Sequence, residues 1–139
     1  MMAFMSSFFC SCVEEERPIP YRDVFIRRNI DIYKIVDYGS YLYIDKRELE
    51  RDRIGYGGIL VLKAMDGFYC AFDLACTKEK DASVKIGKPN TALVCKCPVC
   101  GEEYDLSFGL GVPSKGISKL PLQRYNVSID EYNYLIVTQ

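Results

Sequence analysis

Runs of apolar residues along the chain predict a protein built from short β-strands. Residues 24–30 and 30–33 alternate apolar with polar side chains, which predicts an extended strand pair or one long strand. Short apolar runs predict further strands at 41–44, 59–63, 68–74, 84–86, 91–95, 125–129 and 134–137. Asp66-Gly67 is a favoured hairpin pair between two of these runs. We therefore expect an all-β fold.

The same alternation predicts which side chains face the core. Four side chains share one side of the strand predicted at 68–74 and are expected in the core: Phe68, Cys70, Phe72 and Leu74. Cys95 follows Leu93 on the face of its own strand and is also expected to be buried. The segment 45–53 is dense in charge and has no apolar stripe. It is expected to be a solvated loop or a single helical turn.

Length and charge set the class of protein. A chain of 139 residues fits one domain and can bury a core without staples. Eighteen basic and nineteen acidic side chains leave a net charge of −1, which excludes a broad basic surface for nucleic acid. Eleven Tyr and seven Phe suit a sheet-rich protein, because aromatic residues favour strands.

The first twelve residues resemble the end of a bacterial lipoprotein signal, in which a cysteine after a small residue is lipidated. Cys12, preceded by Ser11, is the expected lipidation site. Residues 1–12 are thus predicted as a leader, 13–22 as a tether and 23–139 as the folded domain. No stretch reaches the roughly eighteen apolar residues of a membrane span. We expect a lipid-anchored protein of the bacterial envelope, on the periplasmic or surface side; the alternative is a frayed apolar tail.

The spacing of three cysteines points to a metal site. Cys97 and Cys100 are separated by Pro98 and Val99, so two thiolates on one turn can face a single ion. Pro98 stiffens that turn, and the following glycine is free to adopt a positive φ. Cys76 lies upstream in a separate loop. The three thiolates are therefore candidate metal ligands.

From residue 58 to 138 the chain resembles a Rieske iron–sulfur domain. That family carries Cys-x-His, then Cys-x-x-His, Gly-x-x-Tyr-Asp-Leu, a loop rich in glycine and proline, and a Pro-Leu pair before two closing strands. The counterparts here are Cys76-Thr77-Lys78, Cys97–Cys100, Gly101–Leu106, Gly109–Pro113 and Pro121-Leu122. The chain most resembles the Rieske-like lipoproteins of Gram-negative bacteria. The resemblance implies antiparallel sheets in a β-sandwich, with two hairpin loops forming a [2Fe–2S] cluster site for electron transfer.

The chain departs from that family at the two histidine ligands, since it contains no histidine. Lys78 and Cys100 stand at the two lost positions. A thiolate can replace a histidine, but an ammonium must first lose its proton. Cys76, Cys97 and Cys100 remain as candidate ligands, and either Cys95 or Glu79 is the candidate fourth. Lys78 is alternatively a cation that stabilises the nearby thiolates.

Three chemistries are open for this site. An iron–sulfur centre with altered ligands would have a low potential, near the roughly −400 mV of ferredoxins, because thiolates add negative charge. Zinc accepts three thiolates and a fourth donor in a tetrahedron. A metal-free site, with two thiols joined as a disulfide, is the third, since an oxidising envelope permits disulfides.

Two classes of function follow from these chemistries. In the first, the domain transfers electrons to an unknown redox or surface partner. In the second, it is a non-redox binding or structural module at the cell surface, supported by zinc or a disulfide or free of metal. The sequence holds no Ser-His-Asp set and no phosphate-binding glycine loop, so we expect no complete enzyme.

Overall fold

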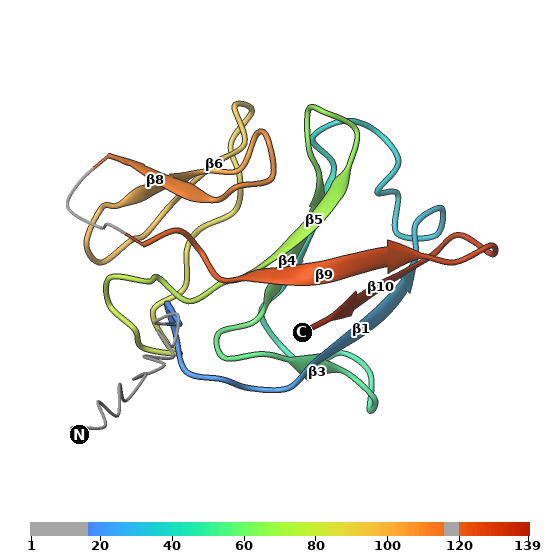
Figure 1. Cartoon of the computed structure of the whole chain (residues 1–139), viewed down its shortest axis with the longest axis horizontal. Helices are drawn as coiled ribbons and strands as arrows, with labels where there is room; N and C mark the ends of the chain where they lie inside the picture. The colour runs from blue at the N-terminus through green and yellow to red at the C-terminus, as the bar shows by residue number, and fades with distance from the viewer. Residues whose placement is uncertain (1–16, 116–119) are drawn as a thin grey trace, which may run out of the picture.

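The protein folds into two antiparallel sheets of different size, which confirms the all-β expectation (Figure 1). The computed structural model describes residues 17–115 and 120–139. The larger sheet contains β1 (Val24–Asn29), β2 (Tyr41–Ile44), β3 (Arg53–Ile54), β4 (Ile59–Lys63), β5 (Tyr69–Asp73), β9 (Arg124–Ile129) and β10 (Tyr134–Thr138). The smaller sheet contains β6 (Val94–Lys96), β7 (Glu103–Asp105) and β8 (Val112–Lys115).

The larger sheet has the strand order β2-β4-β5-β9-β10-β1-β3. β4, the second strand from one edge of this sheet, is buried on both faces, which explains an apolar run without alternation. Ile59 and Val61 face a core formed by this sheet and by Ile35 from the connection between β1 and β2, and Leu60 and Leu62 face a second core. The smaller sheet contributes to that second core through Cys95 and Tyr104. The β4–β5 hairpin therefore joins the two cores.

Most predicted strands are present, and the exceptions have local causes. The strands expected at 41–44 and 59–63 have those bounds. The strand expected at 30–33 is wrong, because the chain turns there. The Asn29 side chain accepts the N–H groups of Asp31 and Ile32 at 3.0 and 3.1 Å and so ends β1.

A second polar side chain shortens the strand before the cysteine knuckle. Asn90 Oδ1 accepts the N–H groups of Ala92 and Val94, both at 2.9 Å, so residues 91–93 form a turn and β6 begins only at Val94. Leu93 has a φ of +58° in this turn and is still buried. The strand expected at 84–86 is reduced to one bridge between Lys85 and Ala75.

The expected burial holds for Cys70, Phe72 and Leu74 but is wrong for Phe68, which is 75% exposed. Phe68 precedes β5 and lies at the tip of the β4–β5 hairpin, outside the strand whose alternation would turn it toward the core. Cys70 donates its S–H to the Leu62 carbonyl at 3.7 Å, as a buried thiol should.

The charged segment 45–53 is a loop, as expected, but it holds one buried side chain. Asp52 receives two hydrogen bonds from the Arg28 guanidinium, at 2.9 and 2.6 Å, and both side chains are within 1% of full burial. This bidentate pair joins the loop to β1. Alternation along β1 puts Arg28 on the buried face with Val24 and Ile26, and Asp52 supplies the opposite charge that lets an arginine remain there.

The predicted leader and the lipidation site at Cys12 lie outside the described residues. Of the predicted tether, Ile19 is only 2% exposed, and Arg17 donates to the Gln139 side chain at 3.5 Å. The domain boundaries at 12 and 22 stay predictions. Among the described residues, no helix is long and apolar enough to span a membrane.

Candidate metal centre

Two loops carry the three candidate cysteines. Cys76 follows β5 and Ala75, which forms an isolated bridge with Lys85. A hydrogen bond from the Lys80 N–H to the Cys76 carbonyl, at 2.9 Å, closes the loop of Cys76. The knuckle with Cys97 and Cys100 connects β6 to β7. The Gly101 N–H donates to the Cys97 carbonyl at 3.0 Å, and Gly101 has a φ of +76°, which a glycine adopts without strain.

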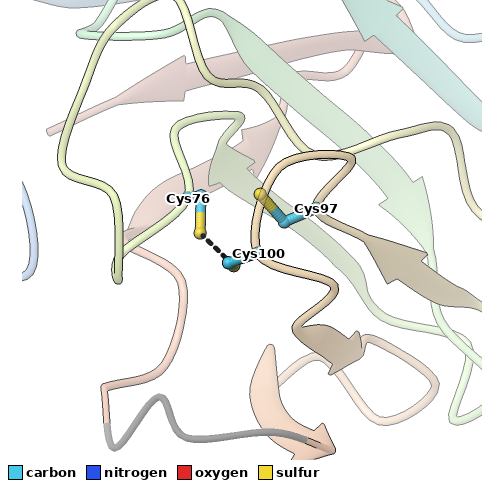
Figure 2. Close-up of side chains that lie close together, drawn as sticks. All are labelled: Cys76, Cys97 and Cys100. Atoms are coloured by element: carbon cyan, nitrogen blue, oxygen red, sulfur yellow. Dashed lines mark hydrogen bonds between the residues drawn. The ribbon is translucent and has the colours of Figure 1, made fainter.

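These loops bring the three sulfur atoms together (Figure 2). The Sγ atoms of Cys76, Cys97 and Cys100 all lie within 4.8 Å of one another. Cys76 Sγ and Cys100 Sγ are 3.6 Å apart. Cys76 and Cys97 are fully buried at the edge of the second core, whereas Cys100 is partly exposed. All three are free thiols, and such a cluster of soft donors is chemically suited to a thiophilic metal ion.

Polar groups around Cys76 favour its thiolate. Burial raises the pKa of this thiol, but hydrogen bonds from the Tyr104 hydroxyl, from the backbone N–H groups of Glu79 and Lys78, and from Cys97 bring the pKa below its ordinary value. The Tyr104 oxygen lies 3.5 Å from Cys76 Sγ and 2.9 Å from Thr77 Oγ1. The single Thr77 hydroxyl proton can be donated to the Leu120 carbonyl at 2.8 Å or to the Tyr104 oxygen, and in the second case the Tyr104 proton is directed at Cys76 Sγ.

Cys100 has the opposite tendency. Burial, together with the neighbouring Cys97 and Cys76 side chains, raises the pKa of Cys100 to about 11, against a hydrogen bond from the Glu102 backbone that lowers it. Cys76 therefore ionises before Cys100. Full ionisation of the cluster needs a positive charge among the sulfurs, and a bound metal cation supplies one.

The other predicted site residues lie apart from this group. Among the described residues, the cluster contains neither Cys95 nor Glu79. Cys95 is buried in the second core, which raises its pKa to about 12, and Glu79 is partly exposed. The Lys78 side chain is exposed, and the backbone N–H of Lys78 lowers the pKa of Cys76 by a hydrogen bond to its sulfur. The ligand roles of Cys95 and Glu79, like those of the three clustered cysteines, stay predictions.

Asp73 is a positioning residue that sequence reasoning missed. Its Oδ1 atom accepts the N–H groups of Gly57 and Ala75 at 2.9 and 2.8 Å. Its Oδ2 atom accepts the Tyr56 N–H at 2.8 Å and the Tyr125 hydroxyl at 2.7 Å. These bonds fix the chain immediately before Cys76. No local sequence pattern predicts these hydrogen bonds, because Tyr125 is far from Asp73 in the sequence.

Comparison with known proteins supports the fold. No protein-family model matches the chain, and no curated protein matches it. A ferredoxin of Sphingomonas yanoikuyae B1 is similar in structure, with a TM-score of 0.50 and 17% identity over 77% of this chain and 92% of that chain. The ferredoxin of carbazole 1,9a-dioxygenase from Nocardioides aromaticivorans IC177 has a TM-score of 0.50 and 18% identity over 83% and 97% of the two chains.

A third similar structure is a complex of reduced oxygenase and oxidised ferredoxin in carbazole 1,9a-dioxygenase, with a TM-score of 0.51 and 14% identity over 83% of this chain and 93% of that chain. At such identities the likeness concerns the fold. The chain has the Rieske-like, all-β fold that its sequence landmarks indicate.

The described residues do not supply the ligands of the [2Fe–2S] cluster that this fold implies. Such a cluster takes four protein ligands, two on each iron, and a Rieske cluster takes two of them from histidine. The chain has no histidine, and the cluster of donors contains three cysteines. The site is one ligand short of a two-iron cluster but sufficient for a metal ion with an additional donor.

Proposed function

We propose that this protein is an electron-transfer domain whose redox centre is an iron bound by the thiolates of Cys76, Cys97 and Cys100. The observation that carries the proposal is the convergence of three sulfurs from two loops within 4.8 Å of one another. The similarity in fold to ferredoxins supports a redox role. Bound iron supplies the one-electron chemistry, and the protein supplies ligands and electrostatics.

The residues around the sulfurs have separable roles in such a centre. The Tyr104 hydroxyl and the backbone N–H groups beside Cys76 place partial positive charge at the most buried side of the cluster. Hydrogen bonds to the sulfurs are one of the factors that set the potential of a thiolate-bound iron. Cys100 is partly exposed, so it lies between the buried sulfurs and the surface on which a partner would dock.

The partner and the location belong to the same proposal. One similar structure is a ferredoxin in complex with an oxygenase, which supports a protein partner that exchanges electrons with this chain. We further propose that the domain is held at a membrane of the bacterial envelope by a lipid on Cys12. The sequence of the first twelve residues supports this anchor.

Iron content and colour test the redox role. Protein purified without oxygen is expected to contain iron and to absorb visible light, and dithionite should bleach that absorption. Cys100→Ser should lose both iron and colour. Cys70→Ser is the matched control, because Cys70 is a buried thiol that does not belong to the cluster. Colourless wild-type protein without iron would contradict the proposal.

A second candidate is a structural zinc site in a non-redox binding module at the cell surface. The observation that favours it is the 3.6 Å separation of the Cys76 and Cys100 sulfurs. Zinc–sulfur bonds of about 2.3 Å in a tetrahedron place two sulfurs about 3.8 Å apart. Wild-type protein that retains zinc, has no visible absorption and loses stability on treatment with a chelator would favour this candidate over iron.

A further inference from the structure

We infer that the three-cysteine cluster binds one metal ion in a tetrahedral site whose fourth position is open to a small neutral nitrogen donor from solution. This inference deepens the proposed function and rests on its metal site. It replaces the two-iron cluster implied by the fold with a mononuclear centre.

The distances between the sulfurs carry the first step. Thiolates on one tetrahedral ion lie about 3.8 Å apart, with metal–sulfur bonds of about 2.3 Å. Cys76 Sγ and Cys100 Sγ are 3.6 Å apart, and no pair in the cluster exceeds 4.8 Å. Sulfurs bound to two different irons are separated by the length of a cluster, which exceeds one tetrahedral edge. All three sulfurs therefore fit around one ion.

The backbone also resists a wider arrangement. The Cys97 N–H donates to the Glu102 carbonyl at 2.8 Å, and the Gly101 N–H donates to the Cys97 carbonyl at 3.0 Å, so the knuckle is closed by its own hydrogen bonds. Cys76 is held by the fixed Ala75 on one side and by the Lys80 N–H on the other. Moving Cys100 away from Cys76 to admit a second iron would open these turns.

The number of donors carries the second step. Within residues 17–115 and 120–139, no fourth His, Cys, Asp or Glu joins the cluster. Cys95 is packed in the second core, pairs in register with Tyr104 and does not belong to the cluster. Three protein ligands with an open fourth position are typical of zinc sites that bind a water or a substrate.

The placement of Cys100 determines access to the open position. Cys76 and Cys97 are fully buried, whereas Cys100 is partly exposed, so the cluster has one face toward solvent. The neighbouring tip residue Val99 is 63% exposed and does not cover it. Three thiolates around a divalent ion leave one net negative charge, which favours a neutral donor over an anion at the fourth position.

Cobalt titration tests this inference on the full-length, reduced protein under anaerobic conditions. Co²⁺ should give sulfur-to-metal charge-transfer bands and the intense visible bands of a tetrahedral ion, with an end point at one ion per chain. Imidazole should then shift the visible bands without releasing the metal. Cys100→Ser should weaken Co²⁺ binding at least about tenfold. Cys70→Ser, outside the cluster, should bind as the wild type does.

Three results would overturn the inference: an end point of two ions per chain, purified protein with two irons and two acid-labile sulfides, or cobalt bands that imidazole leaves unchanged. These outcomes are separate from the redox proposal. One bound Co²⁺ in a protein that purifies without iron would leave the mononuclear site standing and remove electron transfer. A reducible two-iron cluster would support electron transfer and rule out the mononuclear site.

Discussion

Cys76 is the thiol whose surroundings most favour a negative charge, and Tyr104 is the side chain that contributes most to this. Its hydroxyl lies 3.5 Å from the sulfur and is fixed by Thr77 at 2.9 Å. Replacing Tyr104 with Phe removes this donor and keeps the ring in the core. A hydrogen bond to a charged group contributes about 1.5–3 kcal/mol, which corresponds to roughly one pKa unit or more.

Tyr104→Phe is therefore expected to raise the pKa of Cys76 in the metal-free protein and to slow its alkylation near neutral pH. Iodoacetamide kinetics against pH, with the modified residue identified by mass spectrometry, measure this change. Tyr69→Phe is the matched control, because it removes a hydroxyl bonded to the Ile35 carbonyl away from the cysteines. Equal Cys76 reactivity in Tyr104→Phe and the wild type would rule out the hydroxyl as a stabilising donor.

Asp73 acts on the site through the backbone. Burial raises the pKa of this carboxyl, against hydrogen bonds from Ala75, Tyr125, Tyr56 and Gly57. Asp73→Asn would set an amide N–H₂ group against these donors. We expect a loss of about 3 kcal/mol in the free energy of unfolding, measured with urea.

Asp81→Asn is the matched control for Asp73→Asn. Asp81 is exposed and bonds only locally, to Ser83. Its replacement should leave the urea midpoint unchanged. If Asp73→Asn were as stable as the control, the four bonds to Asp73 would not be holding the chain before Cys76.

At the scale of residues, the sequence located the candidate ligands better than the side chains that surround and position them. The knuckle cysteines and Cys76 are recognisable because their residue type and spacing carry the chemistry. Asp73 and Tyr104 are not, since each acts on partners brought close only by folding. Tyr104 belonged to a Tyr-Asp-Leu landmark, but that landmark alone does not say where its hydroxyl points.

Among the elements, the two connections of the smaller sheet depend on glycines in different ways: Gly101 lies between β6 and β7, and Gly111 lies between β7 and β8. Gly111 has a φ of +64°, and an added Cβ would lie 2.7 Å from a ring carbon of Phe72. Gly101 has a φ of +76° but meets nothing within 4 Å. Alanine at either position incurs the cost of a left-handed backbone, about 1–2 kcal/mol.

Gly111→Ala should be the more damaging of the two substitutions, because it also displaces a fully buried aromatic ring. We expect its free energy of unfolding to fall below that of Gly101→Ala by roughly 1–3 kcal/mol. Urea unfolding of both variants measures the difference, and the shared backbone cost cancels. Equal stabilities would mean that the Phe72 ring can move aside without lowering the free energy of unfolding.

The loop between β2 and β3 depends on the buried pair of Arg28 and Asp52. Burial raises the pKa of Asp52, but the Arg28 hydrogen bond and charge, with the N–H groups of Leu49 and Glu48, bring the pKa below its ordinary value. The folded protein thus binds fewer protons at Asp52 than the unfolded chain does. The resulting stability is present above the unfolded-state pKa, near 4, and is lost as pH falls through the lower folded-state pKa.

Asp52→Asn should therefore lower the free energy of unfolding at pH 7 by about 3–5 kcal/mol, since it leaves a buried guanidinium without its counter-charge. Its unfolding should also depend less on pH below about 4 than that of the wild type. Urea titrations at several pH values measure both effects. Glu48→Gln is the control, because Glu48 is half-exposed at 3.4 Å from Arg28 and should cost less than about 1 kcal/mol.

Sequence patterns located the long strands but did not predict where polar side chains end them. β4 is recognisable because an unbroken apolar run indicates burial on both faces. Asn29 and Asn90 each hydrogen-bond two backbone N–H groups and replace predicted strand with turn. β3 spans two residues, Arg53 and Ile54, and is too short for any period to reveal.

For the whole molecule, the order of landmarks predicted more than periodicity could. The Rieske-like fold follows from loops spaced correctly along the chain, and two cores joined by the β4–β5 hairpin hold those loops together. The same landmarks imply a two-iron cofactor for which residues 17–115 and 120–139 do not supply a full set of ligands. Fold and cofactor are separable, because β-sheet packing does not depend on the two missing histidines.

X-ray absorption at the metal edge, on protein purified without oxygen, tests the central claim most directly. A single ion bound by Cys76, Cys97 and Cys100 predicts three sulfur neighbours at about 2.3 Å and one lighter atom, with no second metal nearby. A short metal–metal distance with bridging sulfide, or a metal with fewer than three sulfur neighbours, would contradict it.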